Sequence, residues 1–308
     1  MQEAHQNLAR SAHTAAIELT SPYPGGGKTH LLYDLIALNV LPKYLNGRQS
    51  CVAIFDSDGA FDVVRLVQQF RQRLPLQLPE NTDTGAAIET ALQHVHIFRP
   101  QSLASLTATI ENLPAYLLHT SHPSSDRALS FIALDSASAF YWQARAAEED
   151  YTYRNTTGSS SPSQAPLEEP ASYAQVTTAL KTAAKALNAP VVLTSWSLHA
   201  PPTQQHNHGP PRSLRPSLPA PLSALPTARF VVQRIPVRCL PAHISVREAL
   251  REAGDRQRAV DEGKFECVVN QWGLDPRTLE QVRASGEGFG FRISDAGLVI
   301  GGGSTEDS

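Results

Sequence analysis

A glycine-rich stretch, Ser21 to Thr29, constrains the fold of this chain more than any other segment. It reads Ser-Pro-Tyr-Pro-Gly-Gly-Gly-Lys-Thr and lies between an apolar run (15–19) and an amphipathic run (31–36). An apolar run of this length is typical of a buried strand, and the spacing in the second run is typical of a helix. Glycine permits the tight backbone conformations that a sharp turn needs. The sequence therefore predicts a buried strand, a glycine-rich turn and a helix that begins near Lys28.

The same stretch has the residue types that bind the phosphates of a nucleotide. Glycines let backbone N–H groups turn toward a phosphate, and the start of a helix adds partial positive charge. In such a P-loop, Lys28 would bring its charge to the outer phosphates and Thr29 its hydroxyl to Mg²⁺. The usual pattern begins with a glycine where this chain has Pro22, and a turn without a ligand is the alternative. The predicted site for ATP and Mg²⁺ consists of Gly25, Gly26, Gly27, Lys28, Thr29 and His30.

Composition indicates an ordinary globular protein. The chain has 308 residues, 41% of them hydrophobic, and a net charge of −3, which is too close to neutral to indicate a nucleic-acid partner by itself. Three widely spaced cysteines indicate a reducing compartment, and the absence of a signal peptide or a long apolar run predicts a soluble intracellular protein with no membrane partner. We expect a disordered segment at 1–14, a single core at 15–303 and a tail at 304–308.

Strand-like and helix-like patterns alternate through the first half of the chain. This alternation predicts the α/β class, with a mostly parallel central sheet and helices on both faces. Beyond residue 228 the apolar runs predict further strands, including a closing pair near the C-terminus that we expect to be antiparallel. Two segments lack periodicity and are predicted to be mobile loops: 145–172, with an acidic patch and a Ser/Pro tract, and 199–226, rich in proline and histidine.

Polar residues follow several of the predicted strands. Asp58 comes after the apolar run 51–55, and Asp135 ends the run 131–134. Because ligands gather at the carboxyl ends of parallel strands, these residues should meet the glycine-rich turn. Asp135 is the predicted ligand of the magnesium shell, through water, and Asp58 is a candidate to polarise an attacking water. Trp196, which ends the run 191–195, occupies the position where such proteins sense the γ-phosphate.

Two strings of residues resemble the core of RecA-type recombinases, and more narrowly that of recombinase paralogues. They are residues 55–66 and residues 134–142, the latter Leu-Asp-Ser-Ala-Ser-Ala-Phe-Tyr-Trp. The resemblance covers roughly residues 15 to 197 and implies a RecA-like P-loop ATPase core. It also implies a nuclear protein of homologous recombination. Such a protein would form a hetero-oligomer with other paralogues and would assist strand-exchange filaments on DNA. The DNA would be single-stranded or a junction, bound directly or through the complex.

Departures from the recombinase pattern predict weak hydrolysis. Active recombinases carry a glutamate at the position of Asp58 and a glutamine at the position of Trp196, whose ring offers one donor and no acceptor. Losing one preorganised transition-state group typically costs about a hundredfold in rate. We therefore expect a subunit that binds ATP and hydrolyses little of it. The alternatives are an active P-loop ATPase, and an interaction subunit with a vestigial P-loop that works without nucleotide.

The strongest basic cluster lies between residues 212 and 258, where arginines outnumber acidic residues. An arginine cluster contacts phosphate well, so DNA is one predicted partner of this region. The alternative is a solvated helix face with charges paired one turn apart. The candidate DNA contacts are Arg212, Arg215, Arg229, Arg234 and Arg238.

Overall fold

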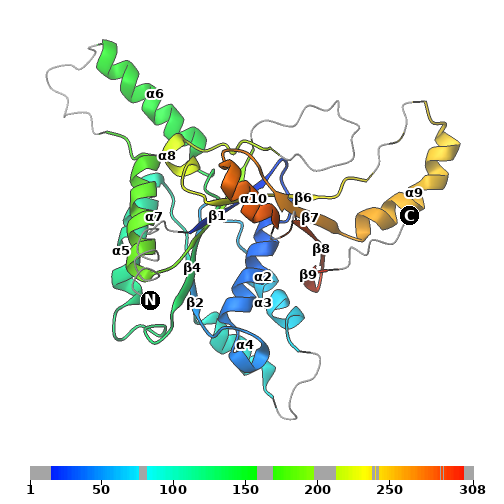
Figure 1. The fold of residues 1–308 in the computed structure, drawn as a ribbon, viewed down its shortest axis with the longest axis horizontal. Helices are drawn as coiled ribbons and strands as arrows, with labels where there is room; N and C mark the ends of the chain where they lie inside the picture. The colour runs from blue at the N-terminus through cyan, green and yellow to red at the C-terminus, as the bar shows by residue number, and fades with distance from the viewer. Residues whose placement is uncertain are drawn as a thin grey trace.

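A nine-stranded sheet forms the centre of the molecule (Figure 1). The computed structural model describes residues 15–75, 82–157, 169–197, 213–237, 240, 243–284, 286 and 288–301. The strand order is β3-β2-β4-β5-β1-β6-β7-β8-β9. The strands are β1 (Ala16–Ser21), β2 (Cys51–Asp56), β3 (Val95–Phe98), β4 (Leu129–Asp135), β5 (Val191–Trp196), β6 (Ala228–Arg234), β7 (Lys264–Val269), β8 (Gly288–Ser294) and β9 (Gly297–Ile300).

The strands from β3 to β6 pair in parallel, and the last three pairings, from β6 to β9, are antiparallel. This arrangement confirms the predicted α/β fold with a mostly parallel sheet and antiparallel strands toward the C-terminus. The helices are α2 (Lys28–Val40), α3 (Val63–Gln72), α4 (Thr84–Leu92), α5 (Leu103–Leu117), α6 (Tyr141–Thr157), α7 (Tyr173–Leu187), α8 (Ala220–Ser223), α9 (Val246–Asp261) and α10 (Pro276–Ala284), with a short 3₁₀ turn, η1, at Lys43–Leu45.

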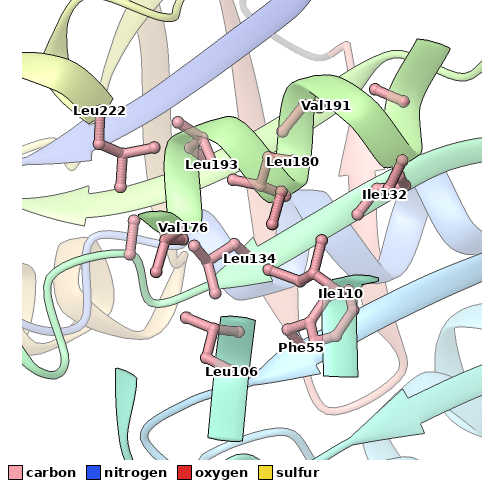
Figure 2. Close-up of a cluster of buried hydrophobic side chains, with 14 of the residues drawn as sticks. Phe55, Leu106, Ile110, Ile132, Leu134, Val176, Leu180, Val191, Leu193 and Leu222 are labelled. Carbon is pink, nitrogen blue, oxygen red and sulfur yellow. The ribbon is translucent and has the colours of Figure 1, made fainter. Parts of the chain in front are cut away.

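Successive residues of the central strands pack into two different cores, one on each face of the sheet. On one face, α5, α7 and α8 cover side chains such as Phe55, Leu134 and Leu193 (Figure 2). On the other face, α2, α3 and α4 cover side chains such as Ile54 and Ala133. Burial on both faces explains why these strands are continuously apolar in sequence. The core near the C-terminus joins β6 to β9 with the first turn of α2.

Residues 145–157 correct one prediction, because they continue helix α6 rather than forming a loop. Two of the three acidic residues in the patch that suggested a loop pair with arginines along the helix. Arg145 pairs with Glu149 at 3.0 Å and Arg154 pairs with Asp150 at 2.9 Å, each one turn apart. Pairs at this spacing stabilise a helix modestly. Most of α6 is exposed, and it projects from the body, as does α9 (Figure 1).

The second predicted loop also differs from expectation over residues 213–226. Leu214, Leu218 and Leu222 are buried, and the Asn270 side chain accepts from the Leu214 N–H at 2.9 Å and donates to its carbonyl at 2.7 Å. Both backbone groups of Leu214 are thus satisfied inside the protein, as burial requires. Within the two predicted loops, residues 158–168 and 199–212 lie outside the described residues, as do 1–14 and 302–308.

A polar network fixes the edge strand β9 to helix α3. Gln69 donates to the Leu298 carbonyl at 3.1 Å and accepts from the Leu298 N–H at 2.6 Å. The same amide donates to Asp34 on α2 at 2.7 Å, and Asp34 binds the guanidinium of Arg73 at 2.6 and 2.8 Å. All the buried polar atoms of this network therefore have partners, and the network joins α2, α3 and β9.

Two buried histidines on the chain entering and forming β3 share one serine hydroxyl. His94 Nδ1 and His96 Nε2 lie 2.8 and 2.9 Å from Ser124 Oγ. Burial lowers the pKa of His94, and it lowers the pKa of His96 to about 4. His122 lowers both pKa values further, and its ring centroid is 4.7 Å from that of His96. Arg127 also lowers the pKa of His94, whereas Asp126 raises it. Both imidazoles are therefore neutral in the folded protein near pH 7.

We predict that the free energy of unfolding falls as the pH drops from about 6.5 toward 4. In this window the unfolded chain binds protons at His94 and His96 that the folded protein excludes, so acid favours unfolding. At a pH below both its folded and unfolded pKa values, the lowered pKa of His96 reduces the free energy of unfolding by about 3 kcal/mol. Urea unfolding at pH 7 and pH 5 should show a smaller pH effect in His96→Gln than in the wild type. Replacement of the exposed His119 by Gln is the control and should leave the pH dependence unchanged. Equal pH slopes for the wild type and His96→Gln would contradict this account.

Candidate functional site

The turn between β1 and α2 needs glycine at each of its three glycine positions. Gly25 and Gly27 have φ values of 72° and 93°, which lie in the left-handed region. A Cβ atom on Gly26 would lie 2.3 Å from Ser21 Oγ and 2.8 Å from the Val232 carbonyl oxygen. Gly27 is the N-cap residue of α2, and Lys28 is the first residue of the helix. Each of these positions therefore requires glycine, as a backbone that turns its N–H groups toward a phosphate would.

Strands β1, β4 and β5 bring their carboxyl ends together beside this turn. Thr29 Oγ1 donates a hydrogen bond of 3.0 Å to Asp135 Oδ2, and the Thr194 hydroxyl donates to the other carboxylate oxygen, Oδ1. Asp135 is 4% exposed and Thr194 is 1% exposed. The structure thus brings together the two residues that the sequence assigned to a magnesium shell. The strand order places them there, because β5 lies between β4 and β1.

Lys28 and two carboxylates define the charge of the site. Burial lowers the pKa of the Lys28 amine, and the carboxylates of Asp135 and Asp58 oppose that effect. Burial likewise raises the pKa of Asp135. The hydrogen bond from Thr194 opposes this rise most, and the hydrogen bond from Thr29 and the charge of Lys28 oppose it to a smaller extent. A cation and an anion that are both partly desolvated attract each other strongly, so Lys28 and Asp135 each favour the charged form of the other.

Asp58 lies in the exposed turn after β2 and faces the charge of Lys28. Its Oδ1 accepts from the Ala60 N–H at 3.3 Å. Partial desolvation raises its pKa, with a further contribution from Asp56, whereas Lys28 lowers it. The neighbouring carboxylates have structural partners: Asp56 binds Arg99 at 3.0 Å, and Asp62 is the N-cap of α3. Asp58 is therefore the carboxylate after β2 that remains available to the site.

The two other predicted contacts, Trp196 and His30, have different surroundings. Trp196 ends β5 and is 40% exposed, and its backbone N–H donates to Ser138 Oγ at 3.1 Å. The His30 ring packs edge-on against Tyr33, with 5.6 Å between the ring centroids. Its Nε2 is buried and has no hydrogen-bond partner among the described residues, and burial lowers the pKa of the ring. A role for His30 in phosphate binding would therefore use its backbone N–H.

The prediction that Arg229 contacts DNA is wrong, because its side chain is internal. Arg229 on β6 is 2% exposed and forms an ion pair with Glu18 on β1. It also donates to the Ser223 carbonyl, and its guanidinium carbon lies 5.1 Å from the ring centroid of Trp272. Sequence reasoning missed this pair, although Glu18 gave a signal: a charge within a buried strand requires a partner.

The other predicted DNA contacts fall into three groups. Arg234 donates to the Val260 carbonyl near the end of α9 and stacks 5.7 Å above the Phe265 ring, so it supports the helix. Arg215 is exposed. Arg212 and Arg238 lie outside the described residues.

Thr194 is the residue of the site that the sequence did not identify individually. It appeared only as part of a polar strand end, and the apolar run before it gives no sign that its hydroxyl reaches Asp135. In the described part of the chain, no group of three or more His, Cys, Asp and Glu side chains could hold a metal ion by itself. A magnesium ion would thus depend on nucleotide phosphates together with Thr29 and, through water, Asp135.

Comparison with known proteins gives a match over part of the chain. The chain is 36% identical over 118 residues to DNA repair protein XRCC2 of Mus musculus. The chain resembles a RecA-type recombinase paralogue. The match covers 38% of this chain and 38% of the mouse protein, and no family model matches the chain. It confirms the resemblance that the sequence motifs indicated. In the described ranges, no helix has the length and apolar character needed to cross a membrane.

We predict that Arg229→Ala lowers the free energy of unfolding by about 3–5 kcal/mol, because it leaves Glu18 buried without its counter-charge. The exposed Arg215→Ala is the matched control and should change it by less than about 0.5 kcal/mol. Urea unfolding of the three proteins at pH 7 measures both values. A loss below about 1 kcal/mol in Arg229→Ala would show that the pair contributes no more than an ordinary surface contact.

Proposed function

We propose that the protein is a nucleotide-binding subunit of a DNA-repair complex that acts in homologous recombination in the nucleus. The observation that carries this proposal is the meeting of Thr29 and Thr194 on the Asp135 carboxylate, next to Lys28 and the glycine turn. The resemblance to DNA repair protein XRCC2 supports the assignment to recombination. Other RecA-type paralogues are the proposed partners in a hetero-oligomer that assists strand-exchange filaments.

The residues present fit ATP and Mg²⁺. Left-handed glycines allow backbone N–H groups to turn toward a phosphate, and a side chain on Gly26 would collide with Ser21. Lys28 would contact the outer phosphates, and the Thr29 hydroxyl can donate to Asp135 while its oxygen remains available to a cation. Bound Mg²⁺ would neutralise phosphate charge.

Weak hydrolysis is part of the proposal. Asp58 lies on an exposed turn, and its shorter side chain holds the carboxylate farther from the site than a glutamate would. Trp196 can donate through its indole N–H but cannot accept. These two positions lack the groups that active recombinases use to orient water and sense the γ-phosphate. Nucleotide would therefore serve to hold the subunit in one conformation, rather than to drive a cycle.

DNA contact is proposed for the complex, with this subunit contributing through exposed arginines. Among the described candidates, Arg215 is exposed, whereas the side chain of Arg229 is buried in an ion pair with Glu18. The acidic residues of α6 disfavour DNA along that helix, because Glu148, Glu149 and Asp150 outnumber its arginines in the same stretch.

Lys28→Ala should weaken the binding of Mg²⁺–ATP about 10- to 150-fold, because a hydrogen bond to a charged group contributes about 1.5–3 kcal/mol. Titration with a fluorescent ATP analogue measures the affinity, and the exposed Lys43→Ala is the matched control. Loss of paralogue binding in Lys28→Ala would also support a nucleotide-dependent interface. Equal nucleotide affinity in the wild type and Lys28→Ala would favour the alternative, a vestigial P-loop.

Purified wild-type protein saturated with Mg²⁺–ATP should release phosphate more slowly than about one per second, the low end of typical enzyme turnover. The double variant Asp58→Glu with Trp196→Gln should hydrolyse at least about tenfold faster, because it restores both missing groups. A phosphate-release assay with Lys28→Ala as the blank measures these rates. Faster steady turnover by the wild type would replace this proposal with that of an active ATPase.

A further inference from the structure

Thr194 holds one of the two oxygens of the Asp135 carboxylate. Its hydroxyl donates to Oδ1, and the Thr29 hydroxyl donates to Oδ2 at 3.0 Å. Each carboxylate oxygen thus receives one hydroxyl hydrogen, one from β5 and one from the first turn of α2. Thr194 and Asp135 are both almost fully buried. The bond from Thr194 is therefore shielded from water, which would otherwise replace it.

The register of the sheet places Thr194 opposite Asp135. Leu134 pairs with Leu193 across β4 and β5, so the next residue on each strand is Asp135 and Thr194. Side chains alternate along a strand, and Val192 packs into the core on the α2 side. Thr194, two residues later, has its side chain on that same side. Ser195 has its side chain on the opposite face, where its Oγ lies 2.7 Å from Thr20 Oγ1.

We propose that Thr194 is a positioning residue of the nucleotide site: it fixes the Asp135 carboxylate so that the Thr29 hydroxyl hydrogen points at Oδ2 and the Thr29 oxygen faces Mg²⁺. This inference rests on the proposed nucleotide-binding function. A carboxylate rotates readily about its terminal bond, because that torsion has broad minima. Without Thr194, Asp135 would keep one hydroxyl partner and could turn away from the geometry in which Thr29 serves the metal.

The electrostatics of the site agree with this role. Burial raises the pKa of Asp135, and the hydrogen bond from Thr194 is the largest effect that opposes burial. Thr29 and Lys28 contribute in the same direction to a smaller extent.

The test compares three variants of the full chain. Thr194→Val removes the hydroxyl with little change in shape, and Thr194→Ser keeps it. Thr20→Val makes the same chemical change at an equally buried threonine, whose hydroxyl bonds on the opposite face of the sheet. The affinity for a fluorescent ATP analogue is measured with Mg²⁺ and with EDTA, and the ratio of the two affinities gives the effect of Mg²⁺.

Thr194→Val should reduce the gain in affinity from Mg²⁺ about tenfold, the effect expected from loss of one hydrogen bond to a charged group. Its affinity in EDTA should stay within about twofold of the wild type, because Lys28 and the glycine turn are unchanged. Thr194→Ser and Thr20→Val should keep the wild-type gain. A merely structural role would instead change the affinity equally with and without Mg²⁺.

If Thr194→Val folds and gains as much nucleotide affinity from Mg²⁺ as the wild type does, the inference is overturned and the proposed function is left intact. If Thr194→Val does not fold, Thr194→Ala is measured against Thr20→Ala by the same criterion. Wild-type protein that binds no nucleotide in either condition would overturn the proposed function and the inference with it. The two failures are therefore distinguishable.

Discussion

Three segments from distant parts of the chain meet at one carboxylate, and their meeting requires β4, β5 and β1 to be neighbours in a parallel sheet. Asp135 ends β4, Thr194 lies near the end of β5, and Thr29 lies in the first turn of the helix that follows β1. In parallel strands the carboxyl ends share one edge, so a ligand there contacts several segments at once. The two cores on either side of the sheet fix these strands, and the hydroxyl–carboxylate contacts depend on that support.

On the face of the sheet opposite Asp135, strand β1 has a second polar contact, an ion pair with a neighbouring strand. Glu18 and Arg229 join β1 to β6 inside the protein, and Arg229 also binds the Ser223 carbonyl of α8. One oxygen of Glu18 and the Nε of Arg229 have no hydrogen-bond partner among the described residues. Such a pair is costly to break, although it adds little compared with a well-packed apolar pair. The pair joins β1 to β6, the strand with which the antiparallel part of the sheet begins.

Sequence reasoning predicted the parts of the fold that local patterns encode. Continuous apolar runs such as 51–55 and 131–134 identified buried strands, and the glycines before Lys28 identified the turn, because each follows from nearby residues alone. The ending of strands in Asp135 and in the 194–196 segment allowed their meeting with Thr29 to be predicted. The prediction failed where the partner lies far away. Arg229 resembled a surface cation, and only the pairing of β1 with β6 shows that Glu18 neutralises it. Residues 145–157 of the loop predicted over 145–172 are helical for a local reason that was visible, since Arg145 and Glu149 are one turn apart.

The amide of Gln69 has a consequence for how this protein can associate with others. It occupies both backbone groups of Leu298 on β9, the last strand of the described sheet. An open edge strand is a template on which a foreign strand can be added. At Leu298 both backbone groups are already hydrogen-bonded to the Gln69 amide, which also donates to Asp34. A neighbouring subunit therefore cannot extend the sheet at this position by β-augmentation, and would need to approach through helices or through another edge.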